Sequence, residues 1–237
     1  MRRRVLVTRP QPGAARTAAR LEALGFEPVL LPLSETTTLP VNAHDAPPDA
    51  VAVAITSANA IRHAPKQLIA ALVRLPCHAV GRKTAKAARE AGFVSVNEGP
   101  GDADALADQM AAALSGTTIV YLCGRVRLPT FEERLATADI GVVPVETYDT
   151  LELRHESAAV ATQLAGKPLN AVLLYSAKAA SAFAALAGRP ELDHLFGSAI
   201  FFCLSGRVAA ALSTVHGEKI RVSPEPNEPA LLALLPA

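Results

Sequence analysis

The sequence predicts an α/β protein with two lobes, each built of a parallel sheet covered by helices. Short apolar runs rich in Val, Ile and Leu alternate with stretches of helical spacing along the whole chain. The run at residues 49–56 is apolar enough to be a strand buried on both faces. Two extended segments that contain Thr, residues 31–40 and 142–151, lie far apart in the sequence. Such alternation favours parallel strands joined by right-handed crossovers. Since each of the two extended segments is flanked by this α/β pattern, we interpret them as crossings between the lobes.

The crossings divide the chain into a discontinuous outer lobe and a continuous inner lobe. Five strand signals fall between them, and the two chain ends together supply another five. We therefore expect an outer lobe of residues 1–35 plus 152–237 and an inner lobe of residues 38–148. A chain of 237 residues, half of them hydrophobic, is long enough to bury a core in each lobe.

Strands are expected where β-branched or other apolar runs end at small or hydroxyl residues. In chain order they are residues 4–8, 28–33, 49–56, 78–80, 94–96, 118–122, the start of 142–151, 171–175, 199–204 and 219–222.

Helices are expected between these strands, with Gly25, Gly92 and Gly217 as stop signals and Asp102 as an N-cap. In chain order they are residues 13–24, a helix from 57 that breaks near Pro65, and then 83–91, 104–114, 130–137, 155–165, 177–187, 207–215 and 228–235.

Composition and charge exclude several classes of function. The formal net charge of +1 gives no argument for nucleic acid, and no run approaches the roughly 20 apolar residues of a membrane span. The chain start is too poor in apolar residues for a signal peptide. Cys77, Cys123 and Cys203 lie far apart in apolar runs, which excludes a CxxC site and indicates reduced core thiols in a cytoplasmic protein. The histidines show no metal-binding spacing, so no metal is expected.

A faint internal repeat suggests that the lobes share one architecture. Residues 52–59 are similar to residues 172–178, and residues 78–83 are similar to residues 203–208. In the second pair the glycine-to-glycine spacing, Gly81 to Gly92 and Gly206 to Gly217, is the same.

The candidate binding residues lie at the carboxyl ends of the predicted strands, where ligands bind in open α/β sheets. Each of these turns offers small or hydroxyl residues at a helix start, mostly with a cation, and this combination suits an anion. One such turn is weak evidence, but six on two lobes indicate a ligand with many separated negative groups. The candidates are Arg9, Thr56, Ser57, Arg82, Lys83, Thr84, Gly124, Arg125, Ser176, Lys178, Ser205, Gly206 and Arg207.

Tyr148 is the candidate for acid catalysis. It lies between Thr147 and Asp149, so its phenol is expected to be presented rather than buried. A phenol there either donates a proton or hydrogen bond, or simply packs against a helix, and both interpretations stay open. Tyr121 and Tyr175, each at the end of another predicted strand, are weaker candidates. The motifs GxGxxG, GxxxxGK[ST] and GxSxG are absent, which argues against a phosphate loop or a serine nucleophile.

Several segments, in their order and spacing, resemble the uroporphyrinogen-III synthase family, and the resemblance covers nearly the whole chain. The segments that carry it are Val5-Leu6-Val7-Thr8-Arg9-Pro10, Leu21-Glu22-Ala23-Leu24-Gly25-Phe26, Pro28-Val29-Leu30-Leu31-Pro32, Ile55-Thr56-Ser57-Ala58-Asn59-Ala60, Ala79-Val80-Gly81-Arg82-Lys83-Thr84-Ala85 and Val145-Glu146-Thr147-Tyr148-Asp149-Thr150.

The resemblance implies two flavodoxin-like lobes joined by a two-stranded connection, with the substrate between them. It implies a cyclising hydro-lyase of tetrapyrrole and heme biosynthesis that converts hydroxymethylbilane into uroporphyrinogen III, inverting the last pyrrole and losing water. The enzyme would need neither metal nor organic cofactor and would act as a cytoplasmic monomer, in sequence with hydroxymethylbilane synthase. Tyr148 matches the family's acid candidate, Thr84 its threonine after the inner-lobe glycine, and Ser176 one of its strand-end hydroxyls. The corresponding outer-lobe position holds Ala209, for which Ser205 could substitute.

Two other functions fit the same pattern less well. A two-lobed binding protein for a polyanionic small molecule would also have two crossings, but we see no export signal. A transferase that uses a sugar nucleotide would be expected to carry a phosphate loop. Identification of the product isomer formed from hydroxymethylbilane separates the synthase from both.

Overall fold

The computed structural model describes residues 2–212 and 217–236, and they divide into two compact units. Unit 1 contains residues 1–35 and 151–237 except the undescribed ones, and unit 2 contains residues 36–150. Both are mixed α/β units with a predominantly parallel sheet, so the predicted fold class is confirmed.

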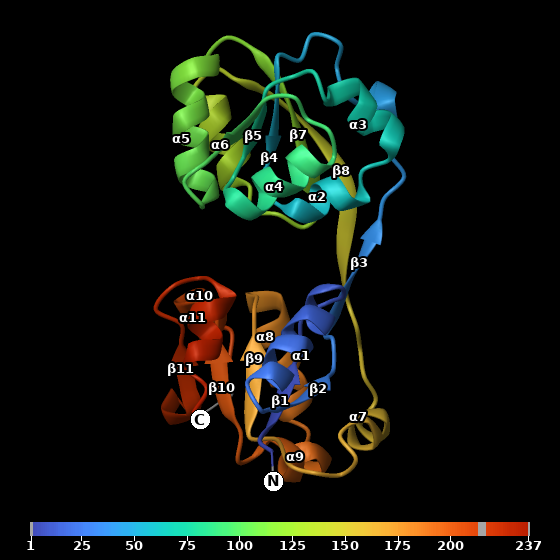
Figure 1. The fold of residues 1–237 in the computed structure, drawn as a ribbon, viewed down its shortest axis with the longest axis vertical. Helices are drawn as coiled ribbons and strands as arrows, with labels where there is room; N and C mark the ends of the chain where they lie inside the picture. Colours follow the sequence, from blue (N-terminus) through green and yellow to red (C-terminus); the bar gives the residue numbers. More distant parts are fainter. Residues whose placement is uncertain (1, 213–216, 237) are drawn as a thin grey trace. The chain divides into compact units, whose positions relative to one another are not determined.

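Unit 1 has a five-stranded sheet with helices on both faces (Figure 1). The sheet order is β11-β10-β9-β1-β2, and each pair of neighbouring strands is parallel. Its elements are β1 (Arg4–Val7), α1 (Gly13–Ala23), β2 (Glu27–Leu30), α7 (Ser157–Gln163), β9 (Ala171–Leu174), α8 (Ala177–Ala187), α9 (Asp193–Phe196), β10 (Ile200–Cys203), α10 (Gly206–Ala210), β11 (Ile220–Val222) and α11 (Glu228–Ala233).

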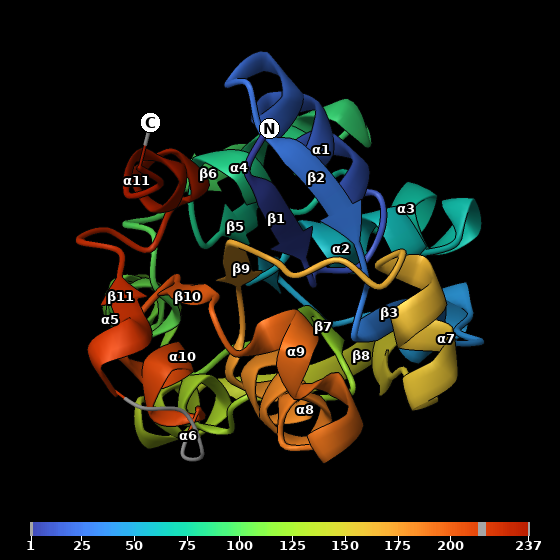
Figure 2. The ribbon, with the colours of Figure 1, turned by 90° about the horizontal axis from the view of Figure 1, so that it is seen from below.

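Alternation along the strands of unit 1 divides its core into two layers, because successive side chains point to opposite faces. Leu6 packs on the face covered by α7, α8 and α9, whereas Val5 and Val7 pack on the face covered by α1 and α11. Figure 2 shows these two helix layers on either side of β1, β9 and β10.

Unit 2 has a six-stranded sheet in the order β3-β8-β7-β4-β5-β6. Helices α2, α3 and α4 pack on one face and α5 and α6 on the other. Its elements are β3 (Ser34–Thr38), β4 (Ala52–Ile55), α2 (Ala58–His63), α3 (Lys66–Leu72), β5 (Cys77–Ala79), α4 (Arg82–Glu90), β6 (Val96–Glu98), α5 (Ala103–Leu114), β7 (Thr118–Gly124), α6 (Thr130–Thr137) and β8 (Gly141–Glu152).

Strands β3 and β8 form the two-stranded connection. The Leu39 amide donates to the Thr147 carbonyl at 3.0 Å, and the Leu153 amide donates to the Leu33 carbonyl at 3.0 Å. Since the later residue of one strand pairs with the earlier residue of the other, these two strands run antiparallel. The two crossings are therefore hydrogen-bonded neighbours, and β3 gives unit 2 the sixth strand that counting strand signals missed.

The two sheets share one topology in circularly permuted form. Unit 1, numbered by its own strands, has the flavodoxin order 2-1-3-4-5. In unit 2 the same spatial order results when β7 and β8 are counted as the first two strands and β4, β5 and β6 as the last three. This correspondence pairs β4 with β9 and β5 with β10, as the sequence repeat does.

Several elements differ from the sequence-based expectation. Helix α10 ends at Ala210 rather than reaching 215, although residues 213–216 of that prediction lie outside the described residues. Gly217 begins a 3-10 turn. Tyr121 lies in the interior of β7 rather than at its end, because the strand continues to Gly124. Helix α9 was not predicted; it is a single turn buried through Leu195 and Phe196, too short for a periodic signal.

Candidate active site

Each sheet has a switch point where the strand order reverses, and ligands of open α/β sheets bind there at the carboxyl ends of the strands. In unit 1 the switch point lies between β1 and β9, and in unit 2 between β7 and β4. Gly124 ends β7, and the turns after the four strands hold Arg9, Ser176, Thr56, Ser57 and Arg125; all six were candidates from the sequence. The permuted topology thus brings candidates from distant segments to one edge of each sheet.

Arg9 follows β1 and is held by residues of its own unit. Its Nη1 donates to Glu228 Oε1 at 3.1 Å, and its guanidinium lies over the Tyr175 ring, 4.4 Å from the centroid. Gly13 makes room for it, since a Cβ there would lie 2.5 Å from Arg9 Nε. The guanidinium is therefore already paired with a carboxylate.

Glu228, at the start of α11, is the centre of this arrangement and was not predicted. Its carboxylate also accepts hydrogen bonds from the Thr17 hydroxyl and Arg20, and from the Tyr175 hydroxyl at 3.1 Å. Burial alone would raise the pKa of Glu228, but Thr17, Arg9 and the other donors outweigh it and hold the pKa below its usual value. The carboxylate consequently stays ionised and ties α11 to α1 and β9.

Equivalent serines begin the helices after β4 and β9. Ser57 caps α2 by accepting from the Asn59 amide at 3.2 Å, and Ser176 caps α8 by accepting from the Ala179 amide at 3.2 Å. Thr56 bonds to the Tyr121 hydroxyl at 2.7 Å. Because the serine oxygens accept these capping hydrogen bonds, the groups that remain for a ligand in these turns are chiefly donors, namely the serine hydroxyl protons and the other backbone N–H groups.

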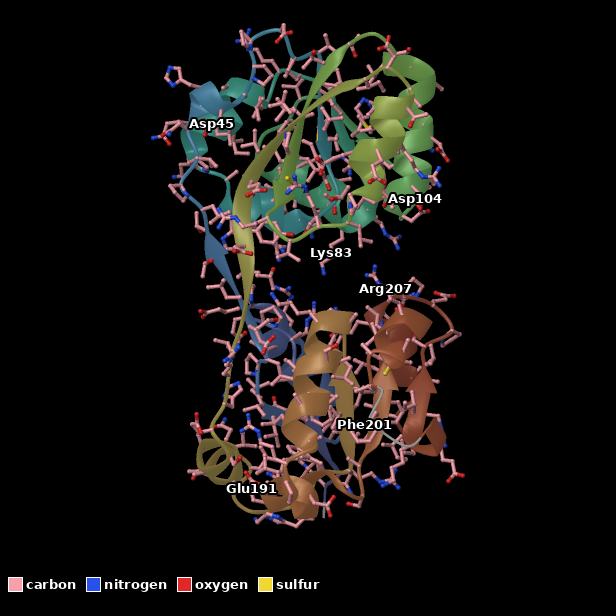
Figure 3. The ribbon with its side chains drawn as sticks, turned by 180° about the vertical axis from the view of Figure 1, so that it is seen from behind. Asp45, Lys83, Asp104, Glu191, Phe201 and Arg207 are labelled. Atoms are coloured by element: carbon pink, nitrogen blue, oxygen red, sulfur yellow. The ribbon has the colours of Figure 1, made fainter. Side chains whose placement is uncertain are left out.

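The turns after β5 and β10 correspond through their helix N-caps, Gly81 and Ser205. Figure 3 marks Lys83 in the first turn of α4 and Arg207 in the first turn of α10. Arg82 and Arg207 are exposed and form no ion pair with any residue that the structure describes. Lys83 is likewise exposed, and Lys178 is half-buried in the first turn of α8.

The sequence repeat matches Gly81 with Gly206, whereas alignment of the two helices by their N-caps matches Gly81 with Ser205, one residue earlier. Thr84, buried at the third position of α4, then corresponds to Val208 rather than to Ala209. Val208 packs in the core of unit 1, so unit 1 has no hydroxyl at the position that Thr84 occupies in unit 2. Ser205 is two residues past β10, and its side chain makes no capping hydrogen bond.

A β-bulge determines which face of the sheet the Tyr148 side chain occupies. Strands β7 and β8 pair in regular register up to Cys123 and Glu146, after which Gly124 pairs with Tyr148. The skipped residue reverses the alternation, so Tyr148 packs on the same core as Val145, three residues earlier.

The Tyr148 ring is closely framed although half-exposed. It stacks on His63 of α2 with 5.7 Å between the ring centroids, and a Cβ on Gly124 would lie 2.6 Å from its Cζ. Its hydroxyl has no hydrogen-bond partner among the described residues. The ring is thus held while the hydroxyl is left for a ligand.

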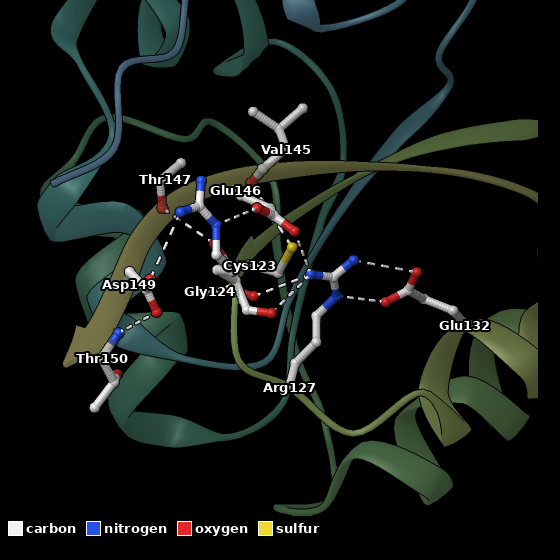
Figure 4. Close-up of polar contacts among 10 residues, drawn as sticks. Cys123, Gly124, Arg127, Glu132, Val145, Glu146, Thr147, Asp149 and Thr150 are labelled. Carbon is white, nitrogen blue, oxygen red and sulfur yellow. Dashed lines mark hydrogen bonds and ion pairs between the residues drawn. The ribbon is translucent and has the colours of Figure 1, made fainter. Parts of the chain in front are cut away.

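A network of arginines and carboxylates surrounds the bulge (Figure 4). Arg125 pairs with Glu146 at 3.1 Å and with Asp149 at 3.6 Å. Arg127 donates to Glu132 at 2.5 Å, to Glu146 at 2.8 Å and to the Gly124 carbonyl at 3.1 Å. Sequence reasoning included Arg125 but missed Arg127; the available signal was a second arginine in the turn after β7.

The three thiols and the Tyr121 phenol are perturbed by burial. Cys77, Cys123 and Cys203 are free buried thiols, as predicted, and burial raises the pKa of each to about 12. Burial also raises the pKa of Tyr121 to about 12. Among residues 2–212 and 217–236 there is no cluster of His, Cys, Asp and Glu that could hold a metal, and no helix has the length and apolar character needed to cross a membrane.

The comparisons with known proteins agree with this architecture. The model of the family described as Uroporphyrinogen-III synthase HemD matches residues 15–233. The chain belongs to the uroporphyrinogen-III synthase family. It is accordingly a cyclising lyase of porphyrin biosynthesis that converts hydroxymethylbilane into uroporphyrinogen III, and the alternative of a binding protein is not favoured.

Solved structures of this family share the fold. The uroporphyrinogen-III synthetase of Helicobacter pylori is 18% identical over 99% of this chain and 98% of that chain, with a TM-score of 0.68. A mutant of the enzyme from Thermus thermophilus is 18% identical over 90% of this chain and 89% of that chain, with a TM-score of 0.57. At this identity the likeness concerns the fold. The search of curated proteins found no match.

Proposed function

We propose that Tyr148 assists the loss of the hydroxyl group of hydroxymethylbilane, while the strand-end turns of the two units bind the substrate's carboxylates. The observation that carries this assignment is the Tyr148 hydroxyl, which lacks a partner among the described residues although its ring is held between Gly124 and His63. Framed in this way, a phenol is ready to donate to a leaving oxygen.

The chemistry needs only a weak acid. The C–O bond of the hydroxymethyl group breaks as the adjacent pyrrole nitrogen supplies electrons, and the departing oxygen takes a proton from the phenol or from a water molecule bound to it. The substituted carbon of the terminal pyrrole then attacks the resulting azafulvene to give a spiro intermediate. This intermediate opens by breaking the bond between that carbon and the preceding methylene bridge, which generates a second azafulvene, and the free α-carbon of the now inverted ring attacks it to close the macrocycle. The proton released when the last pyrrole regains aromaticity restores the phenol.

The carboxylates are assigned to backbone amides and cations at the helix starts. Four helices begin at the N-caps Ser57, Gly81, Ser176 and Ser205. The free backbone N–H groups and the dipole at a helix start favour an anion. Arg82 and Arg207 add charge that no carboxylate of the described residues neutralises. Lys83, Thr84, Lys178 and Gly206 belong to the same turns and complete the proposed binding set.

The test combines product analysis with Tyr148→Phe. The wild-type chain is expected to form uroporphyrinogen III from hydroxymethylbilane, and the variant to turn over more slowly with a similar KM. A positioned proton donor contributes about 10²–10⁴-fold, and the loss should fall toward the lower end because water can replace the phenol. An unchanged single-turnover rate in the variant, with the type III isomer still formed, would remove the phenol from the chemistry and leave the synthase activity intact.

We further propose that the enzyme is a cytoplasmic monomer that takes its substrate from hydroxymethylbilane synthase. Its buried, unpaired cysteines suit a reducing compartment. Light scattering of the purified chain tests the oligomeric state, and a mass near twice the 24.7 kDa of one chain would contradict a monomer.

A further inference from the structure

We propose that Arg127 is a positioning residue for Tyr148, acting through the bulge between β7 and β8. This inference rests on the proposed role of Tyr148 and assigns a residue that is not among the binding candidates predicted from the sequence. The shift in pairing at Gly124 is what turns Tyr148 toward α2.

Arg127 joins both strands at that point. Its Nη1 donates to the Gly124 carbonyl on β7 at 3.1 Å and to Glu146 on β8 at 2.8 Å. Glu146 is the last β8 residue in regular register, and Gly124 is the first residue beyond the shift. One guanidinium therefore spans the irregular step in the pairing.

Arg127 is itself fixed by Glu132. Its Nε donates to Glu132 Oε1 at 2.5 Å and its Nη2 to Oε2 at 3.5 Å, the parallel geometry that a guanidinium fork forms with a carboxylate. These bonds raise the pKa of Arg127, and those from Arg127 lower the pKa of Glu146, so Arg127 and Glu146 both stay charged. The guanidinium is used internally, which separates Arg127 from a substrate ligand.

Two contacts make the position of Tyr148 depend on the geometry of the bulge. The Arg125 amide donates to the Tyr148 carbonyl at 2.8 Å, which fixes the backbone beside the bulge. Gly124 lies against the Tyr148 ring, so that movement of its backbone changes the surface on which the ring rests. Because a misplacement of about 1 Å can reduce a rate by about 10²-fold, loosening this step should affect catalysis more than binding.

The activity test is a double-mutant cycle between Arg127→Gln and Tyr148→Phe. Arg127→Gln is expected to lower kcat about 10- to 100-fold with little change in KM. In the Tyr148→Phe background the same change should have almost no further effect, since the hydroxyl that it misplaces is gone. Equal losses in both backgrounds would overturn the proposal.

Two matched variants distinguish positioning from charge and from general stability. Arg127→Lys keeps the charge but loses the fork, so it should behave like Arg127→Gln; full activity in the lysine variant would contradict the geometric role. Arg134→Gln removes an exposed arginine of α6, in the same unit, that pairs with Asp104 and Asp108 of α5, and it should leave kcat unchanged.

The position of Tyr148 can be measured without turnover. The chain has only three tyrosines, so labelling their Cζ carbons with ¹³C gives a simple NMR spectrum in which Tyr148 is assigned by its loss in Tyr148→Phe. Arg127→Gln is expected to move the Tyr148 resonance and leave that of Tyr175 in place. If Arg127→Gln does not fold, Arg127→Lys and Glu132→Gln serve in the same measurement, and an unmoved Tyr148 resonance in a folded variant would overturn the proposal. This readout remains valid if Tyr148→Phe turns over normally, so a failure of the catalytic role is seen separately.

Discussion

Glu228→Gln should destabilise unit 1 by an amount that depends on pH. The substitution keeps the size of the side chain but removes the charge that faces Arg9 and Arg20. The side chains of Glu228 and Arg9 are 15% and 20% exposed, whereas that of Arg20 is 53% exposed. Glu228 also lies in the first turn of α11, where an acid is favourable.

The magnitude follows from these contacts. A hydrogen bond to a charged group that is mostly buried is worth about 1.5–3 kcal/mol, which applies to Arg9. The half-exposed Arg20 pair adds about 0.5 kcal/mol because solvent screens it. The helix dipole adds about 0.3–1 kcal/mol. Since an amide retains part of the bonding from Thr17 and Tyr175, we expect a total loss of about 2–4 kcal/mol at neutral pH.

The sign of the pH dependence is set by the lowered pKa of Glu228. A carboxyl whose pKa is depressed by folding stabilises the native state above its unfolded pKa, about 4.3 for Glu, and loses that contribution as the pH falls through the folded pKa. The difference between wild type and Glu228→Gln should therefore be full at neutral pH and shrink in acid, below about pH 4.

The assay is urea unfolding combined with hydrogen exchange measured by mass spectrometry, which reports each unit separately. Peptides from residues 1–35 and 151–237 should lose protection, while those from 36–150 should not. Glu22→Gln is the matched control, because Glu22 is an exposed acid on α1 without an ion pair to a described residue. A loss below about 0.5 kcal/mol, the scale of an ordinary surface change, or one that persists unchanged in acid would refute the reasoning.

Two further predictions concern the proposed site. Gly124→Ala should displace the Tyr148 ring, because the new Cβ would lie 2.6 Å from its Cζ, and turnover should fall toward that of Tyr148→Phe. The control is Gly217→Ala, whose Cβ would meet no atom of the described residues within 4 Å, and normal turnover in Gly124→Ala would contradict the packing argument. Arg82→Gln and Arg207→Gln should raise KM at low salt and lose this effect at high salt, whereas Arg125→Gln should have a smaller effect because Glu146 and Asp149 already pair with it. Equal, salt-independent changes in all three variants would argue against the assigned charges.

The sequence was informative about the fold because each unit is built from short, regular elements. The helix at 130–137 was predicted at its observed bounds, Asp102 was identified as the N-cap of α5, and the break near Pro65 separates α2 from α3. Apolar runs and stop glycines carry such information locally. The pairing of β3 with β8 and the permuted order of unit 2 depend on contacts between distant segments, which periodicity does not record.

The candidate site was predictable only in part, for a related reason. The rule that ligands meet the carboxyl ends of strands found Arg9, Ser57, Arg125 and Ser176 at the two switch points. It did not find Glu228, which comes from the last helix of the chain yet binds Arg9 after its first strand. The role of a side chain such as Arg127 follows from a register shift of one residue, and one sequence gives no sign of such a shift.

The distribution of charge suits the proposed reaction. The arginines after β1 and β7 are neutralised by carboxylates of their own unit, Arg9 by Glu228 and Arg125 by Glu146 and Asp149. Arg82 and Arg207, which have no carboxylate partner in the described chain, belong to the next crossovers, away from the switch points. An unpaired guanidinium beside Tyr148 would disfavour the positive charge that develops on the pyrrole as hydroxide leaves, because like charges repel strongly where water is excluded. Within unit 2, the balanced Arg125 near the phenol and the unbalanced Arg82 farther along the sheet edge would allow the substrate's carboxylates to be held without opposing that charge.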